Sequence, residues 1–321
     1  MNPSLHMNIT HVANFIKVVE WGNVSKAAAH LNIAQPALSR QIQALEAELN
    51  TKLLRRQKWG VEPTEDGKLF LEHAYRIVKE CIAARDGIRS NRGNPAGSVY
   101  LGIPSAYSVS LGPPLMQRMR NIYPNISIHI VEGSSRAVFE WLTSGQLDLA
   151  IVYYSRECDV ENLSPFLTEE MVALTPPQMF EGLSTLSLTD LADRKVVIPP
   201  HPHFLRLALE ARFKELGIPF LPKFEIDSLR CIVEMAHLGD GIAILAPSCI
   251  ARDISEGRLR GMPLNPSLKI TTVLSRTPGR QQTSVVKIVA DVLQDLASEL
   301  APTKGWRVDT DIDNKRQLPI P

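Results

Sequence analysis

The hydrophobic pattern of residues 34–49 predicts an amphipathic helix. Leu38, Ile42, Leu45 and Leu49 recur at spacings of three and four residues, which places them on one helix face. The opposite face carries no long apolar residue and has side chains of the lengths that read base edges: Pro36, Ser39, Arg40 and Gln43. Gln35, at the start of the helix, is a further candidate DNA contact. Taken alone, this window fits an ordinary surface helix equally well.

The residues upstream predict two further helices. An apolar stripe over residues 12–19 ends at residues 21–23, and a short helix is expected over residues 26–31. Either Asn23 or Ser25 can cap this second helix. Because a tight turn separates it from the helix described above, the pattern indicates a helix-turn-helix motif.

A basic stretch follows the helix-turn-helix pattern. Lys52, Arg55, Arg56 and Lys58 precede Gly60, and this order predicts a β-hairpin whose cations lie along phosphate groups. The candidate phosphate contacts are Arg55, Arg56 and Lys58. The alternative for this stretch is a solvated basic loop.

Residues 65–93 predict a long helix with an apolar seam. Thr64 can cap its first turn, and Glu65 and Asp66 stand where the helix dipole favours negative charge. The seam residues recur at alternating spacings of four and three: Phe70, Ala74, Ile77, Cys81, Ala84 and Ile88. We expect a second copy of the chain to cover this seam in a homo-oligomer. The alternative is packing on the N-terminal helices of the same chain.

From residue 98 onward, short apolar strands alternate with helices, which predicts an α/β body with parallel sheets. We expect two subdomains, with the chain crossing between them twice. The first should comprise residues 98–170 and 275–300, and the second residues 171–274. A flexible tail is expected over residues 301–321.

Sheets of this kind bind ligands beyond the carboxyl ends of their strands, in the crevice between subdomains. The loops expected there supply six candidate effector-binding residues: Ser105, Ser134, Ser135, Tyr153, His201 and Ser228. Hydroxyl groups and helix-start N–H groups suit a small anion. Serine is also a preferred helix cap, so a purely structural role fits these serines equally well.

Composition adds a charge asymmetry. Residues 1–93 contain 13 Lys and Arg against 9 Asp and Glu, a net charge of +4, whereas the remainder carries −3. This bias suits a nucleic-acid-binding head on a separate partner domain. No apolar run reaches the length of about 18 residues that a membrane span needs, and the N-terminus has no secretory-signal pattern. The four cysteines have no metal-ligand spacing, so we expect reduced thiols in a cytoplasmic protein.

The sequence resembles the LysR family of bacterial transcriptional regulators over residues 7–300. The matching head residues are Phe15, Ala27, Ala28, Leu31, residues 35–42, Leu45, Glu46, Leu49, Leu53, Leu54, Arg56, Thr64 and Gly67. Residues 142–151 and 239–247 match in the body. The resemblance implies three parts: a winged helix-turn-helix DNA-binding domain at 7–64, a linker and dimerisation helix at 65–93, and an effector-binding domain of periplasmic-binding-protein-like fold at 98–300.

This resemblance implies a sequence-specific regulator that binds double-stranded promoter DNA as a homodimer or homotetramer, and that contacts RNA polymerase if it activates. A small-molecule effector would bind between the subdomains, where positions equivalent to Ser105 and Ser134 line the cleft in the family. At the wing tip the family usually has Arg, whereas this chain has Trp59. Leu53-Leu54, which stand in place of Leu-Phe, and residues 63–68 and 144–148 are similar to the nitrogen-assimilation-control branch, whose members can act without an effector.

Two other classes of function fit the sequence less well. A cytoplasmic solute-binding protein would share the two-lobed body but would have no use for residues 7–67. An enzyme is not expected, because the chain has no Gly-rich phosphate loop, no G-x-S-x-G motif and no carboxylate–histidine constellation. His201 and His203 flank a proline without a carboxylate or Cys at ligand spacing, so no metal site is expected. No catalytic residue and no cofactor is therefore predicted.

Overall fold

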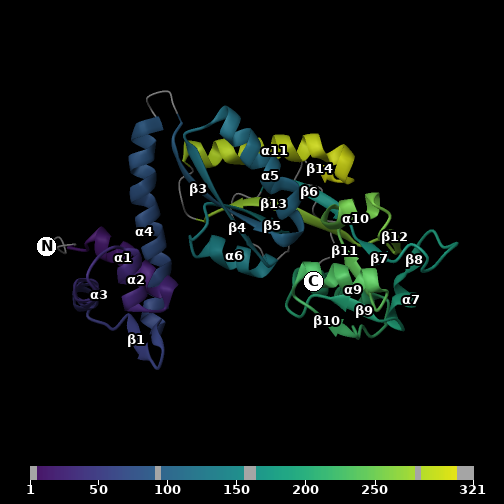
Figure 1. Ribbon diagram of the computed structural model, residues 1–321, viewed down its shortest axis with the longest axis horizontal. Coiled ribbons are helices and arrows are strands. Elements are labelled where there is room, and N and C mark those ends of the chain that lie inside the picture. The colour runs from purple at the N-terminus through teal and green to yellow at the C-terminus, as the bar shows by residue number, and fades with distance from the viewer. Residues whose placement is uncertain (1–5, 91–94, 155–163, 279–282, 309–321) are drawn as a thin grey trace. The chain divides into compact units, whose positions relative to one another are not determined.

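The computed structural model describes residues 6–90, 95–154, 164–278 and 283–308. The chain divides near residues 94 and 95 into two compact units, an N-terminal head and a C-terminal body (Figure 1). Within the described ranges, none of the helices combines the length and the apolar character needed to cross a bilayer.

The described part of the head contains four helices and one hairpin: α1 (Ile9–Trp21), α2 (Val24–His30), α3 (Gln35–Leu49), β1 (Leu54–Gln57), β2 (Gly60–Pro63) and α4 (Glu65–Ser90). Gly22 ends α1 in the left-handed conformation (φ 58°), which glycine adopts without strain. Asn23, rather than Ser25, caps α2: its side-chain oxygen accepts from the N–H groups of Ser25 (2.9 Å) and Lys26 (3.1 Å).

The head core forms where α1, α2, α3 and α4 meet. Leu38, Ile42 and Leu45 are buried, as the spacing of the sequence predicted. Ala27 and Ala28 are also buried, and their small side chains let α2 pack closely on its neighbours. The apolar face of α3 is therefore fixed to the head, and its polar face is turned outward.

The start of α4 also belongs to the head core, which corrects part of the predicted oligomer seam. The Phe70 ring lies 5.4 Å from the ring of Phe15, and Ala74 is fully buried. The apolar surfaces of these two residues are therefore covered within their own chain. Ile77 is half-buried. The exposed remainder of the seam consists of Cys81, Ala84 and Ile88.

The first subdomain of the body is built on a six-stranded sheet in the order β14-β6-β13-β5-β3-β4. Its strands are β3 (Gly97–Pro104), β4 (Ile126–Gly133), β5 (Leu149–Tyr153), β6 (Ser164–Glu170), β13 (Lys269–Arg276) and β14 (Arg307–Val308). β3 pairs in parallel with β4 and β5, as predicted. The sheet is nevertheless mixed, because β13 runs antiparallel to both β5 and β6.

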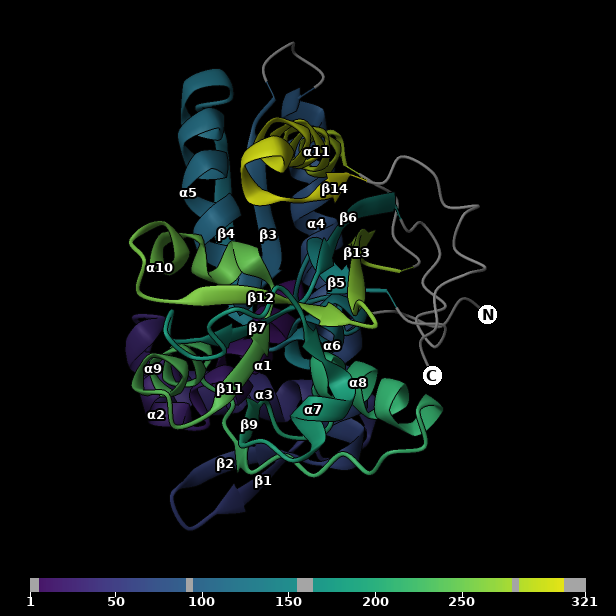
Figure 2. The same ribbon diagram turned by 90° about the vertical axis from the view of Figure 1, so that its right-hand side faces the viewer.

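Helices cover both faces of this sheet: α5 (Ser105–Ile122), α6 (Ser135–Thr143) and α11 (Ser284–Lys304). Alternate residues of β5 point to opposite faces. Leu149 and Ile151 join the core formed with α5 and α11, whereas Ala150 and Val152 join the core formed with α6. Figure 2 shows α11, seen nearly end-on, beside α5, and the two helices are in contact. The sheet is thus buried on both sides, as in other α/β folds.

The second subdomain has a six-stranded mixed sheet in the order β10-β9-β11-β7-β12-β8. Its elements are β7 (Val172–Thr175), β8 (Leu186–Ser187), α7 (Leu188–Ala192), β9 (Val196–Ile198), α8 (Phe204–Glu215), β10 (Phe224–Glu225), α9 (Leu229–Leu238), β11 (Ile242–Leu245), the 3₁₀ helix η1 (Pro247–Ile250), α10 (Ala251–Ser255) and β12 (Arg260–Asn265). β9 pairs in parallel with β10 and β11, whereas β7 pairs antiparallel with β11 and β12.

Two of the predicted boundaries are corrected by the sheets. β13 begins at Lys269 within the first sheet, so the chain returns earlier than the predicted residue 275. The predicted flexible tail is wrong for residues 301–308, because α11 continues to Lys304 and β14 pairs with β6. Trp306, between them, is only 6% exposed. Residues 309–321 lie outside the described part of the chain.

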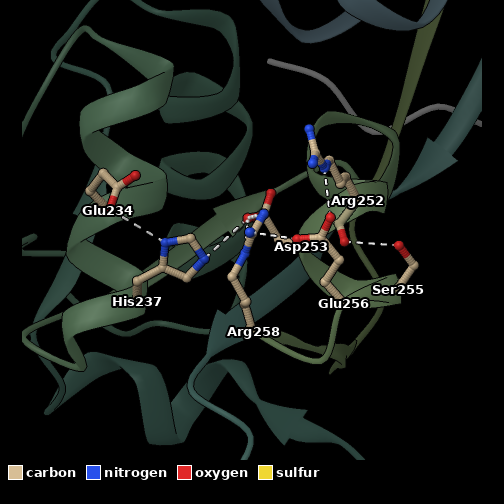
Figure 3. Close-up of polar contacts among 7 residues, drawn as sticks. All are labelled: Glu234, His237, Arg252, Asp253, Ser255, Glu256 and Arg258. Carbon is tan, nitrogen blue, oxygen red and sulfur yellow. Dashed lines mark hydrogen bonds and ion pairs between the residues drawn. The ribbon is translucent and has the colours of Figure 1, made fainter.

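A polar network joins α9 to α10 in the second subdomain (Figure 3). His237 Nδ1 lies 3.5 Å from Glu234 Oε2 on its own helix, and His237 Nε2 lies 3.2 Å from Asp253 Oδ1 on α10. Arg258 Nη2 lies 2.8 Å from the same Asp253 oxygen. Because His237 of α9 and Arg258 both meet half-buried Asp253, this network joins α9 to α10.

Candidate functional site

The predicted base-reading residues lie on the outward face of α3. Four of them are exposed, and Ser39 is half-buried: Gln35, Pro36, Ser39, Arg40 and Gln43. Gln35 Nε2 donates to Ser39 Oγ over 2.9 Å, which holds these two side chains together. On the inner side, Asn14 Nδ2 of α1 donates to Gln41 Oε1 over 2.6 Å. The helix therefore presents a polar surface from a fixed position in the head.

A buried carboxylate, which no local sequence pattern predicts, joins α3 to the hairpin. Glu46 Oε1 accepts from the backbone N–H groups of Leu53 (3.0 Å) and Leu54 (3.3 Å). Its second oxygen, Oε2, lies 2.6 Å from the Lys52 ammonium. A buried charge is costly unless it is paired in this way. The contacts thus fix the start of β1 relative to α3.

The hairpin β1–β2, called the wing below, is also attached to the turn between α1 and α2. The Val61 N–H donates to the Gly22 carbonyl over 2.8 Å. A Cβ placed on Gly60 would lie only 2.0 Å from that same oxygen, so the contact requires glycine at this position. Both ends of the wing are therefore fixed to the helices.

The cations of the wing differ in their surroundings. Arg55 forms an ion pair across the hairpin with Glu62, so a carboxylate of the same chain neutralises the Arg55 charge. Arg56 and Lys58 have no carboxylate partner within the described residues. The Lys58 ammonium lies 5.3 Å from the centre of the Trp59 ring. Arg56 and Lys58 are thus the wing cations with charge available to an external anion.

A separate cavity of about 110 Å³ lies in the body, between its two subdomains. Four residues predicted to bind an effector line it from the first subdomain: Ser105, Ser134, Ser135 and Tyr153. Met171 and Ile270 also line it, at the two places where the chain passes from one sheet to the other. Most of the remaining surface is apolar and includes Ile232 and Leu245 of the second subdomain.

Two helix starts face this cavity. Ser105 begins α5, and no side chain caps the helix at the preceding Pro104. Ser134 precedes α6, and its Oγ accepts from the Ala137 N–H over 3.3 Å, which leaves its hydroxyl hydrogen for another acceptor. Free N–H groups and the helix dipole both favour a negatively charged group at such a position.

Two predicted effector contacts are wrong by one or two positions. His201 is exposed and lies outside the cavity lining, whereas His203 is part of it. Ser228 caps α9 by accepting from the Cys231 N–H (3.4 Å), and its neighbour Asp227 lines the cavity instead. The predicted loops thus reach the cavity, but in these two loops the residues that line it are His203 and Asp227.

His203 is held in one tautomer. Its Nδ1 accepts from the Leu205 N–H over 3.2 Å, as the cap of α8. Burial lowers the pKa of His203, and the nearby Asp227 carboxylate opposes this effect. In the neutral ring the proton is therefore on Nε2, which can donate to a ligand.

The charge of the cavity limits what can bind. Among the described residues that line it, Asp227 is the only carboxylate, and there is no Lys or Arg. A negative ligand group would have to be met by N–H and hydroxyl donors alone. The lining therefore favours one carboxylate on a compact apolar body over a dianion.

A second buried acid lies behind the cavity wall. Glu169 of β6 is 1% exposed, and its Oε1 accepts from the Ser248 N–H over 3.4 Å. Burial raises the pKa of Glu169, although the polar side chains of Ser248, Tyr107 and Trp306 around it act in the opposite direction. Tyr107 lines the cavity. The acid is thus hydrogen-bonded to the 3₁₀ helix η1 and lies near a lining residue and the segment after α11.

Comparison with protein families gives two matches that together span both units. The model described as "Bacterial regulatory helix-turn-helix protein, lysR family" matches residues 9–68. The model described as "LysR substrate binding domain" matches residues 92–298. The first match contains the outward face of α3 and the wing, and the second contains the cavity.

Among curated proteins, the nitrogen assimilation regulatory protein nac of Escherichia coli is 30% identical over 94% of this chain and 99% of its own length. The protein of the same name from Klebsiella aerogenes is 29% identical over 91% of this chain and 96% of its own. These relatives are matched over nearly their whole lengths, so the similarity includes both head and body.

Solved structures show the same fold. A full-length OxyR variant from Pseudomonas aeruginosa matches with a TM-score of 0.70 and 21% identity, over 91% of this chain and 95% of that chain. Full-length CbnR, solved with its target DNA, matches with a TM-score of 0.63 and 20% identity, over 90% of this chain and 100% of that chain.

Proposed function

Since the chain belongs to the LysR family of bacterial transcriptional regulators, we propose that it reads a specific promoter sequence with α3 while the wing holds phosphates. The observation that carries the proposal is the exposed polar face of α3, set opposite a buried apolar stripe. Arg40 and Gln43 are long enough to reach base edges in the major groove. Glu46 fixes the wing beside that helix, so both can contact one duplex.

We also propose that a small monocarboxylate binds in the cavity of the body and modulates the regulator. The starts of α5 and α6 would meet the carboxylate, with the Ser134 hydroxyl as a donor. The apolar wall would hold the rest of the ligand, and His203 Nε2 would donate from the facing subdomain. A ligand shifts the protein only if it prefers one arrangement of the subdomains, which contacts to both of them allow.

The oligomer would form through the exposed part of the α4 seam, as a homodimer or homotetramer, and two heads would then read two half-sites. RNA polymerase would be a further partner if the protein activates transcription. The proposed place of action is the cytoplasm, where promoter DNA is accessible in bacteria. The proposed role involves binding and no catalysis.

Selection from a random duplex library by the full-length chain tests the DNA-binding proposal. The recovered sequences should share a motif with two half-sites whose centres are one or more helical turns apart, because a two-fold dimer presents two α3 helices. Footprinting on a recovered duplex should then protect both half-sites. Recovery of unrelated sequences would contradict the proposal.

Thermal denaturation of the full-length chain with a panel of short aliphatic and aromatic monocarboxylates tests whether such a ligand binds. A compound that binds the folded state raises the melting temperature in proportion to RT ln(1 + [L]/Kd). If no compound shifts the transition while the selected duplex binds tightly, a regulator that acts without an effector is supported instead. The similarity to the nac proteins makes this second candidate worth the comparison.

A further inference from the structure

Trp59 has the highest exposed fraction, 85%, of the large hydrophobic side chains in the described chain. It occupies the tip of the wing, because Lys58 and Trp59 are the two residues between the paired Gln57 and Gly60. An indole so exposed is unfavourable in water unless a partner covers it during function. The proposed function gives roles to α3 and to the wing cations but none to Trp59.

The tip is held in place before anything binds. Gly60, directly after Trp59, packs against the Gly22 carbonyl so closely that no side chain fits there. The Val61 N–H donates to the same carbonyl. Because the wing is fixed to the helices, contact by Trp59 would not require a loop to be ordered first.

The charges around Trp59 select the chemistry of its partner. Arg56 and Lys58 both lie within three residues before Trp59, and the Lys58 ammonium is 5.3 Å from the ring centre. An apolar protein surface would have to desolvate these cations, which is costly. A DNA groove instead offers apolar sugar faces between two rows of phosphates, so it matches both the ring and the cations.

We propose that Trp59 packs against the deoxyribose wall of the minor groove, and that its indole Nε1–H donates to adenine N3 or thymine O2. This inference rests on the proposed function, in which α3 occupies the adjacent major groove. In the minor groove, A·T and T·A pairs present only acceptors, whereas a G·C pair adds the guanine amino donor. The wing tip therefore prefers A·T pairs at the position that it contacts. Trp59 supplies this preference without adding a positive charge.

The test uses the duplex selected by the wild-type full-length chain, with A·T pairs replaced one at a time outside the major-groove motif. Replacement by G·C at the contacted position should weaken wild-type binding about fivefold or more. Replacement by inosine·cytosine should restore it, because inosine lacks the amino group in the minor groove. Trp59→Phe should bind all three duplexes alike, since it keeps an apolar ring but has no N–H donor.

Two further variants separate packing from charge. Trp59→Ala should lower affinity about tenfold and leave the salt dependence unchanged. Trp59→Arg should bind well but increase the slope of log K against log salt by about one, because it adds a phosphate contact. Leu69→Ala serves as the control, since Leu69 is also exposed in the head but lies on α4. It should bind as the wild type does.

The outcomes distinguish this inference from the proposed function. If the wild type selects a motif and Trp59→Ala binds it equally well, the role of Trp59 is wrong and the regulator assignment stands. A loss that is the same for A·T, G·C and inosine·cytosine duplexes also overturns the minor-groove contact. If the wild type selects no motif, the proposed function itself fails. Unchanged melting temperatures of the variants would show that the exposed substitutions leave the head folded.

Discussion

The backbone N–H of Met171 donates a hydrogen bond to the carbonyl oxygen of Leu268 over 2.8 Å. These residues stand at the two points where the chain passes between the sheets of the body, directly after β6 and directly before β13. The neighbouring Lys269 and Glu170 pair in register, with Nζ and Oε1 3.2 Å apart. The two connections are thus joined as one ribbon. Since Met171 also lines the cavity, a bound ligand would touch this ribbon directly.

Arg40→Ala and Arg56→Ala should weaken DNA binding in different ways. If Arg40 reaches a base edge, its loss should cost about 1–3 kcal/mol on the selected duplex and relax specificity at one position. Loss of Arg56 should weaken all duplexes alike and reduce the salt slope by about one. Titrations of selected and scrambled duplexes over a salt series measure both effects. Equal losses on the two duplexes for Arg40→Ala would rule out the base contact.

Ile88→Asp should dissociate the oligomer, because it places a charge in the exposed part of the α4 seam. Ile88 is 70% exposed within its own chain, so the head itself should stay folded. Sedimentation velocity of the full-length variant would show the change in mass. Leu69→Asp is the matched control, since Leu69 is 60% exposed on the same helix but outside the seam. An unchanged mass for Ile88→Asp would mean that another surface joins the subunits.

Ser105→Val should abolish the thermal shift given by any monocarboxylate that stabilises the wild type. The substitution removes a hydroxyl at the cavity and adds methyl groups beside the N–H groups that would meet the carboxylate. Ser228→Ala is the control outside the cavity lining. It should lower stability by about 0.5–2 kcal/mol through loss of the α9 cap while the ligand shift remains. A full shift in Ser105→Val would show that the ligand binds elsewhere.

The stability of Glu169→Gln relative to the wild type should increase as the pH rises, because the wild type loses stability and the uncharged amide does not. Burial raises the pKa of the folded Glu169 carboxyl above its ordinary value of 4.5. Between these two values the unfolded carboxyl is ionised and the folded one is protonated. The wild type therefore loses up to about 1.4 kcal/mol of unfolding free energy per pH unit in this window. Urea denaturation of both proteins between pH 4.5 and 8 should show a difference that grows with pH. A difference that does not change with pH would contradict the raised pKa.

Gly60→Ala and Gly87→Ala should have opposite effects on stability. At Gly60 the new Cβ would meet the Gly22 carbonyl, so the wing must move and DNA affinity should fall. Around Gly87, within α4, no atom beyond the adjoining backbone of the helix lies within 4 Å of the added Cβ, and Ala should stabilise the helix by up to about 1 kcal/mol. Denaturant titration and binding to the selected duplex measure both variants. A wing that tolerates Gly60→Ala would contradict the fixed position of its tip.

The sequence predicted the elements that have strong local signals. Helical spacing located α3 with its buried stripe, and the ends of the apolar strands located Ser105, Ser134 and Tyr153 at the cavity. The strand ends suffice because parallel strands deliver their carboxyl ends to one edge of a sheet, whatever the details of packing. No strong local pattern marks β6 or β12, because their place in the sheets depends on antiparallel pairing with distant strands.

The site residues that the sequence did not predict correctly have a similar cause. His201 and His203 flank the same proline, and the start of α8 decides which of them turns inward. Glu169 meets Ser248 across a sequence separation of 79 residues, so no local pattern marks it as a buried acid. Phe70 and Ala74 fit both a coiled coil and the head core, because both surfaces need apolar residues at the same spacing. In each case only the tertiary partners decide the outcome.

The interrupted layout of the body also determines an order of assembly during synthesis. Residues 171–268 form the second subdomain from one uninterrupted stretch, whereas the first sheet needs β13, α11 and β14 from the stretch that follows. On the ribosome the second core can therefore close while β3, β4 and β5 still await their partners. Until Val289, Leu293 and Trp306 emerge, the apolar face of β3 and β5 that they cover stays open to chaperones and to other nascent chains.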